Sequence, residues 1–387
     1  MKRLYCMAAA LLAVALSAFA QGGNTGDGGP DGDYASLAGR VLNLEKKTEA
    51  FNFYFNYAGS YQLTERSGAL SSAFRAKQLR LEVKGNFGEH LSYRLRHRMN
   101  KGQGAMSEEN FGKATDIMYL GWKFSDKFTL IAGKMCQWWG GFEFDENPMF
   151  IYQYSDMVDC MDNFLVGTAL VLQPLPGQEF VLNITNSYSG VLSDEYGPSA
   201  MTVSGGTLTA ASHPLAYIFN WNGSFLGDML QTRWSIGSYT QAVGYHDRML
   251  FLGEKLNLPR FQVYFDFIGS WEGLDRLRIA SSEIGAGKIV TDVRYLTYLT
   301  KMNWQFAPKW NLMGKGMYET ATVPSLGKYR TSLGYIASLE YYPMKDQDLR
   351  FFVAYLGRAF LYSERSGIPS YFTNRLEVGF MYRIKCY

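Results

Sequence analysis

The feature that most constrains this fold is a series of short alternating segments that runs from residue 50 to the end of the chain. Within each segment apolar and polar side chains alternate, which puts the two kinds on opposite faces of a β-strand. In one segment, Leu120, Trp122 and Phe124 share a face, while Gly121 and Lys123 lie on the other. The many aromatic residues also favour β structure. We predict sixteen strands, at residues 50–62, 72–86, 91–99, 116–125, 128–136, 164–173, 179–187, 214–223, 229–241, 248–255, 260–271, 290–306, 310–321, 330–343, 348–361 and 373–387.

The connections between these segments are alternately short and long. A membrane-spanning barrel has this rhythm, because its periplasmic turns are short, its external loops are longer and its strand number is even. A soluble secreted β protein would turn its apolar faces toward a core and has no reason to alternate its connections. We therefore predict an all-β chain that forms a transmembrane antiparallel β-barrel over residues 50–387. The long connections are predicted at residues 63–71, 100–115, 137–163, 188–213, 242–247, 272–289, 322–329 and 362–372.

The first twenty residues have the organisation of a secretory signal peptide. Lys2 and Arg3 precede an apolar run at residues 7–16, and a small-x-small cleavage site follows at residues 18–20. We predict that residues 1–20 are removed on export, which places the mature chain outside the cytoplasm. No later segment has the roughly 18 consecutive apolar residues that a transmembrane helix needs.

Two short segments separate the signal peptide from the barrel. Residues 21–34 are rich in Gly and Asp and are predicted to form a flexible linker. Residues 35–49 carry Leu37, Val41 and Leu44 at helical spacing, which predicts a short amphipathic helix in the periplasm. A helix this short is marginal alone. We expect it either to seed a trimeric coiled coil or to pack against the barrel mouth.

One strand carries an arginine at every second position. Arg94, Arg96 and Arg98 share a face, and the opposite face, with Tyr93 and Leu95, suits lipid. The arginines are therefore predicted to face the lumen, where a ladder of guanidinium groups attracts anions and binds phosphate or carboxylate oxygens. Two segments, 128–135 and 247–256, are apolar on both faces, so their inward residues are not assigned. The predicted lumen cations are Arg80, Lys84, Arg94, Arg96, Arg98, Lys123 and Arg233.

The third long connection, residues 137–163, is the candidate constriction loop. It combines several acids with several aromatic residues, and a fully solvated loop would be more polar. We expect it to fold into the lumen and pack there. Its acids then either pair with the arginine ladder or form the acidic half of a transverse field. The candidate residues are Glu143, Asp145, Glu146, Tyr152, Tyr154 and Asp156.

Three stretches, together with the AGK of the strand at 128–136, carry a family resemblance: AFNFYFNYAGSYQ, RLEVKGNFGEHLSYRLRHRMNK and GGFEFDENPMFIYQYSD. They resemble the phosphate-selective porin O and P family, in the form found in Bacteroidetes. The resemblance covers most of the mature chain. It implies a sixteen-stranded, trimeric outer-membrane porin with an inward third loop and an arginine-lined channel. A lumen-lining role carries over to Arg94, Arg96 and Arg98.

The predicted function is passive diffusion of small anions, such as phosphate, across the outer membrane of a Gram-negative bacterium. The expected partners are these solutes, outer-membrane lipid and lipopolysaccharide, and further copies of the chain in a homotrimer. Two alternatives stay open. One is a general or sugar-accepting porin with weak charge selectivity. The other is a surface-binding protein that acts through its long loops, residues 188–213 and 272–289.

Other chemistry finds little support in the sequence. The net charge of +3 indicates no nucleic-acid partner, and the four histidines show no metal-ligand spacing. No G-x-S-x-G motif is present. We predict no enzyme activity, no cofactor and no metal. Cys136 and Cys160 could pair in an oxidising compartment, and the sequence leaves that pairing open.

Overall fold

The computed structural model defines the barrel region of the chain. The predicted signal peptide (1–20), linker (21–34) and periplasmic helix (35–49) lie outside the described residues, so their boundaries stay predictions. Within the described part of the chain, no helix is long and apolar enough to cross a membrane. The structure describes residues 50–104, 109–197, 202–203, 206–344 and 347–386.

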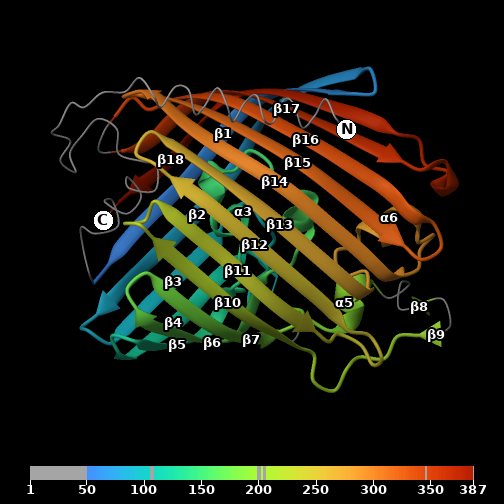
Figure 1. The fold of residues 1–387 in the computed structure, drawn as a ribbon, viewed down its shortest axis with the longest axis horizontal. Coiled ribbons are helices and arrows are strands. Elements are labelled where there is room, and N and C mark those ends of the chain that lie inside the picture. The colour runs from blue at the N-terminus through green and yellow to red at the C-terminus, as the bar shows by residue number, and fades with distance from the viewer. Residues whose placement is uncertain (1–49, 105–108, 198–201, 204–205, 345–346, 387) are drawn as a thin grey trace.

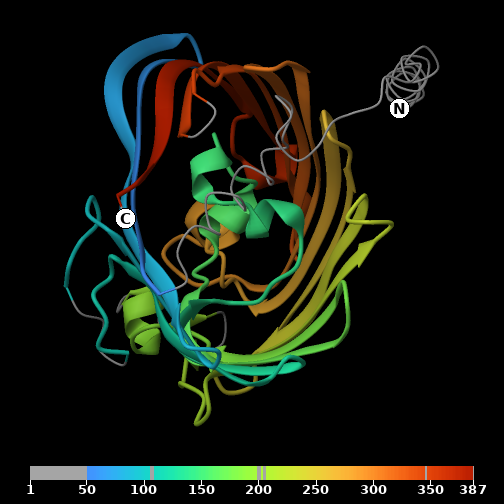
Figure 2. The ribbon, with the colours of Figure 1, turned by 90° about the vertical axis from the view of Figure 1, so that its left-hand side faces the viewer.

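Sixteen antiparallel strands close into a barrel (Figures 1 and 2), which confirms the predicted fold class and strand number. Each strand pairs with its neighbours in sequence, and β1 pairs with β18 to close the sheet. Closure leaves no strand edge unpaired. The barrel strands are β1 (Asn52–Arg66), β2 (Ala69–Phe87), β3 (Leu91–Arg98), β4 (Thr115–Ser125), β5 (Phe128–Cys136), β6 (Phe164–Leu175), β7 (Gln178–Asn186), β10 (Leu215–Phe225), β11 (Leu230–Tyr239), β12 (Asp247–Asn257), β13 (Phe261–Leu274), β14 (Thr291–Ala307), β15 (Trp310–Val323), β16 (Gly327–Tyr341), β17 (Asp348–Tyr362) and β18 (Tyr371–Lys385).

Two of the predicted long connections, 63–71 and 322–329, are wrong. β1 and β2 are joined only by Ser67 and Gly68, whose φ angles are 50° and 89°. Two successive positive φ values make the tight turn that matches the twist of paired strands. β15 and β16 are likewise joined by three residues, 324–326. The strands of both hairpins extend further than predicted.

The outer face of the barrel is apolar. Along β17, Phe351, Val353 and Tyr355 are exposed, as expected for side chains that face lipid. Trp122 and Trp310, which lie near strand ends, are also exposed on this face, as expected for the aromatic belts at the two membrane surfaces.

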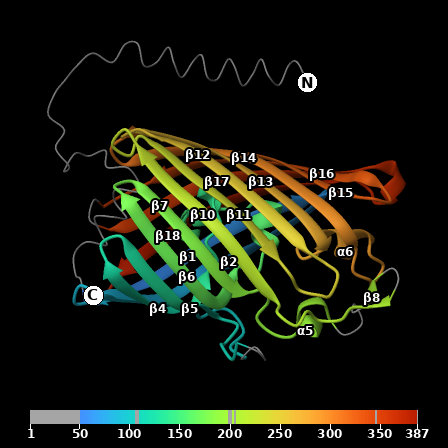
Figure 3. The ribbon, with the colours of Figure 1, turned by 60° about the horizontal axis from the view of Figure 1, so that its bottom comes forward.

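Three of the other long connections carry short elements at one end of the barrel (Figure 3). The connection between β7 and β10 includes the β8–β9 hairpin, which the sequence did not predict. Buried side chains from several of the long connections form one apolar cluster, which includes Leu192, Ala242 and Ile289. The short elements are α5 (Leu192–Tyr196), β8 (Thr202–Val203), β9 (Gly206–Thr207), α6 (Ile279–Ile284) and η3 (Glu364–Ser366).

The connection between β5 and β6 lies inside the barrel (Figure 2). We call residues 137–163 the third loop; it contains α3 (Phe142–Asp145), η1 (Pro148–Phe150) and α4 (Asp156–Cys160). Trp139 of this loop is 1% exposed and stacks on Phe251 of β12, with ring centroids 5.3 Å apart. The third loop therefore supplies an apolar core to the lumen of the barrel.

Candidate functional site in the barrel lumen

The third loop enters the lumen along strand β11, through two glycines. The Gly140 N–H donates to Ser235 Oγ (2.9 Å), and the Gly141 N–H donates to the carbonyl oxygen of Arg233 (3.0 Å). A Cβ atom on Gly140 would lie 2.6 Å from that carbonyl oxygen, so only glycine allows so close an approach. Gly141 has a φ of 88°, which again favours glycine.

A wall carboxylate then receives the start of α3. Asp266 of β13 accepts hydrogen bonds from the N–H groups of Phe142 (2.9 Å) and Glu143 (2.8 Å), one on each carboxylate oxygen. Asp266 is fully buried. A carboxylate at this position satisfies N–H groups that a helix start leaves without partners.

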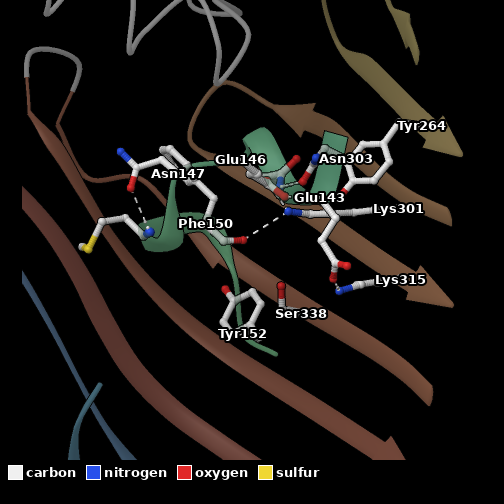
Figure 4. Close-up of polar contacts among 12 residues, drawn as sticks. Glu143, Glu146, Asn147, Phe150, Tyr152, Tyr264, Lys301, Asn303, Lys315 and Ser338 are labelled. Carbon is white, nitrogen blue, oxygen red and sulfur yellow. Dashed lines mark hydrogen bonds and ion pairs between the residues drawn. The ribbon is translucent and has the colours of Figure 1, made fainter. Parts of the chain in front are cut away.

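The next anchor is a buried ion pair (Figure 4). Glu143 is fully buried and pairs with Lys315 of β15. The same carboxylate accepts hydrogen bonds from the N–H (2.9 Å) and the hydroxyl (2.5 Å) of Ser155, which ties the two ends of the loop together. Lys315 also donates to the carbonyl oxygen of Gln153 (2.8 Å). A buried charge pair holds its geometry because either charge left alone would be costly.

Two more loop acids also meet cations of the barrel wall. Glu146 pairs with Lys301 of β14 (Figure 4). Asp156 pairs with Arg330 of β16 (2.7 Å) and with Arg358 of β17 (2.5 Å). Cations of strands β14–β17 therefore pair with three acids of the third loop, Glu143, Glu146 and Asp156.

The other wall of the lumen, formed by β2 and β3, carries the arginine ladder. Arg94 pairs with Glu82 (2.7 Å), and Arg98 Nε lies 2.8 Å from both carboxylate oxygens of Asp116. Arg96 lies 3.5 Å from the same Asp116, and Arg80 of β2 lies 3.8 Å from it. Four arginines thus face two wall carboxylates, and positive charge is left over among them. We call these arginines together with Lys84 the basic wall: Arg80, Lys84, Arg94, Arg96 and Arg98.

A cavity of about 810 Å³ separates the basic wall from the third loop. Six of the seven predicted lumen cations border it: Arg80, Lys84, Arg94, Arg96, Arg98 and Arg233. The seventh, Lys123, does not border it, because it lies beside the turn after β4 and pairs with Asp126 (2.6 Å).

The six predicted loop residues divide into two groups. Asp145, Glu146 and Tyr154 border the cavity. The others bind the far wall: Glu143 and Asp156 through the ion pairs above, and Tyr152 through its hydroxyl, which donates to Glu340 (2.8 Å). The described ion pairs of Glu143, Asp145, Glu146 and Asp156 join these four acids to cations outside the basic wall.

Several lumen residues were missed by the sequence analysis. They are the anchors of the third loop on the wall: Asp266, Lys301, Lys315, Arg330 and Arg358. Each is a charged side chain on a strand whose opposite face is apolar, and this alternation is the signal that marks an inward position. The sequence carries that signal, although it does not say which loop residue each anchor meets.

The described cysteines are all free thiols. Cys136, at the end of β5, and Cys160, in α4, are half-buried, and Cys386 is exposed. The pairing of Cys136 with Cys160 that the sequence left open is not formed.

Asp145 is the loop carboxylate whose charge is most open to change. Its side chain keeps 45% of its surface exposed and lies 3.2 Å from Nε of Arg233. Partial desolvation by the surrounding loop and wall, with the like charge of Glu179, raises the pKa of Asp145 to about 6, although Arg233 opposes the shift. The carboxyl group therefore loses its negative charge as the pH falls through about 6.

We expect the chloride preference of the pore to increase when the pH is lowered from about 7 to about 5. Protonation of Asp145 removes a negative charge from the cavity and leaves Arg233 uncompensated. The measurement is the reversal potential in a planar bilayer under a potassium chloride gradient at each pH. In Asp145→Asn the preference should be high already at neutral pH and should no longer rise; an unchanged rise would contradict the assignment.

A closed sixteen-stranded barrel with a lipid-facing apolar surface, an inserted loop and a charged lumen defines a porin-type channel. The model of the family described as phosphate-selective porin O and P matches residues 51–384. The chain belongs to this family, so it is a passive channel of the outer membrane of a Gram-negative bacterium. Comparison with curated protein sequences gave no match.

Several solved structures have a similar fold. The outer-membrane channel DcaP of Acinetobacter baumannii is 11% identical, with a TM-score of 0.60 over 86% of this chain and 97% of that one. The anion-selective porin of Comamonas acidovorans is 9% identical, with a TM-score of 0.58 over 87% and 99%. OmpT of Vibrio cholerae is 9% identical, with a TM-score of 0.56 over 87% and 99%. At these identities the likeness concerns the fold.

Proposed function

We propose that this porin favours small anions, phosphate among them, and that the basic wall is the filter. The observation that carries the proposal is the separation of charges in the lumen. Four acids of the third loop, Glu143, Asp145, Glu146 and Asp156, are paired with cations of β11 and β14–β17, while the arginines of the basic wall outnumber the carboxylates beside them. A pore whose lining is net positive draws anions in and repels cations.

The test is the triple variant Arg94→Gln, Arg96→Gln, Arg98→Gln. We expect its permeability ratio of chloride to potassium to fall by roughly tenfold, since the field at the cavity loses three positive charges. The reversal potential in a planar bilayer under a potassium chloride gradient gives this ratio. Lys123→Gln is the matched control and should leave it unchanged, because Lys123 lies away from the cavity.

Three outcomes would count against the anion filter. If the unaltered protein shows a potential near zero, the pore is a general or sugar-accepting porin. If the triple variant keeps the preference, other cations set the field. If the protein gives no current, a surface-binding role that uses the outer loops replaces the channel.

The remaining assignments belong to the same proposal. We propose that the chain has no catalytic activity, which the porin family supports, and that it works as a homotrimer in contact with lipid and lipopolysaccharide. One OmpT structure from Vibrio cholerae, 10% identical to this chain, is described as a trimer form. We also propose that export removes residues 1–20 and that the linker (21–34) and the helix (35–49) lie in the periplasm.

A further inference from the structure

The cavity beside the basic wall has a second face of different chemistry. The third loop buries Glu143 and Asp156 against the far wall, and it presents aromatic rings to the cavity beside Asp145, Glu146 and Asp159. The Tyr154 and Phe144 side chains of this loop are half-buried, so part of each ring meets the open space. The aromatic residues that border the cavity are Tyr119, Trp138, Phe142, Phe144, Phe150, Tyr154, Phe164 and Tyr264.

Guanidinium groups of the lumen already lie against rings. The Arg96 guanidinium carbon is 5.1 Å from the centroid of the Phe164 ring, and that of Arg98 is 5.6 Å from it. Arg96 is buried, and its Nε lies 3.5 Å from Asp116. The basic face thus holds guanidinium planes beside a ring, an arrangement in which the ring of a ligand can also stack.

A hydrated inorganic anion would interact with the basic wall of the cavity and would gain nothing from its aromatic side. The volume of about 810 Å³ lies in the range of sites that enclose small organic molecules, and such sites combine apolar walls with a few well-placed polar groups. An apolar body placed against Phe144 and Tyr154 would leave water, while its anionic group would meet the arginines around Asp116.

We propose that the cavity is a binding site for aryl anions, in which an aromatic ring carries a phosphate or carboxylate group. The anionic group meets Arg80, Arg96 and Arg98, and the ring lies against the aromatic face of the third loop. This inference rests on the proposed anion filter, because the same basic wall attracts the charge. It goes beyond that filter by assigning a role to the rings.

The test compares phenyl phosphate with inorganic phosphate as blockers of the current through the full-length protein in a planar bilayer. The two share one anionic group and differ by the ring. We expect phenyl phosphate to reach half-block at a concentration at least roughly fivefold lower, as ring stacking would give. In the double variant Phe144→Leu, Tyr154→Leu this advantage should disappear, while block by inorganic phosphate stays unchanged.

Equal block by the two compounds would overturn the inference, and it would leave the anion filter intact if the chloride preference is normal. An advantage of phenyl phosphate that persists in the double variant would also overturn it, since the rings would then not be the cause. A missing chloride preference would overturn the proposed filter instead. The ratio of the half-block concentrations of phenyl phosphate and inorganic phosphate would still test the aryl-anion site. Block can be measured whether potassium or chloride carries the current.

Discussion

Lys315→Met is expected to release the third loop from the barrel wall and to raise the single-channel conductance. Glu143, the partner of Lys315, is fully buried, and the other side chain that binds Glu143, that of Ser155, carries no charge. Removing one member of a buried pair leaves a buried charge and costs about 3–5 kcal/mol. The variant can escape most of that cost by moving the loop into the water of the lumen. The barrel should persist, because the hydrogen bonds between its strands do not depend on the loop.

Thiol labelling reports the same release independently. Cys160 is half-buried in α4, so it should react faster with a thiol reagent in Lys315→Met, in a background where Cys136 and Cys386 are serine. Lys309→Met is the matched control, since Lys309 is exposed beside a turn. The double variant Glu143→Gln, Lys315→Met should partly restore the slow labelling and the low conductance, because neither charge remains. Unchanged conductance and labelling in Lys315→Met would show that the pair does not hold the loop.

Asp266→Asn is expected to loosen the start of the same loop. An amide keeps one acceptor oxygen, and its NH₂ group would face one of the two N–H donors that the carboxylate now satisfies. Losing a hydrogen bond to a charged group costs about 1.5–3 kcal/mol, which shifts the equilibrium of the docked loop by roughly tenfold or more. The docked loop would still be the major state, so we expect a noisier current with brief openings of higher conductance.

Single-channel recording measures this effect directly. Asp126→Asn is the matched control, since Asp126 lies at a turn and its side chain is 95% exposed. A steady current of normal conductance in Asp266→Asn would contradict the role of Asp266 as the anchor of α3. A loss of folded protein in the membrane would instead show that this carboxylate supports the barrel as well as the loop.

The strands could be predicted from the sequence because alternation is a local property. The segment predicted at 128–136 has the bounds of β5, and the ladder of Arg94, Arg96 and Arg98 lies on the face that alternation assigns to it. Hairpin length was less predictable. β1 and β2 continue their pairing to within two residues of each other, and pairing depends on the partner strand as well as on local sequence.

The strands that are apolar on both faces show where local sequence stops being informative. Ile131 in β5 and Phe251 in β12 lie on the inner face, where they pack with Trp138 and Trp139 of the third loop. Such a strand faces lipid on one side and a protein core on the other, so both of its faces are apolar. Its inward residues can therefore be assigned only when the position of the third loop is known.

By itself the sequence determined the barrel, the inward face of most strands and the segment that supplies the constriction, because each follows from periodicity or composition along the chain. Only the tertiary structure decided which charges meet. Asp116 and Glu82 are the partners of the arginines of the basic wall, whereas Glu143, Glu146 and Asp156 of the loop pair with Lys315 and its neighbours on the far side. Charge pairing depends on distance in space, and the curvature of the closed sheet sets those distances.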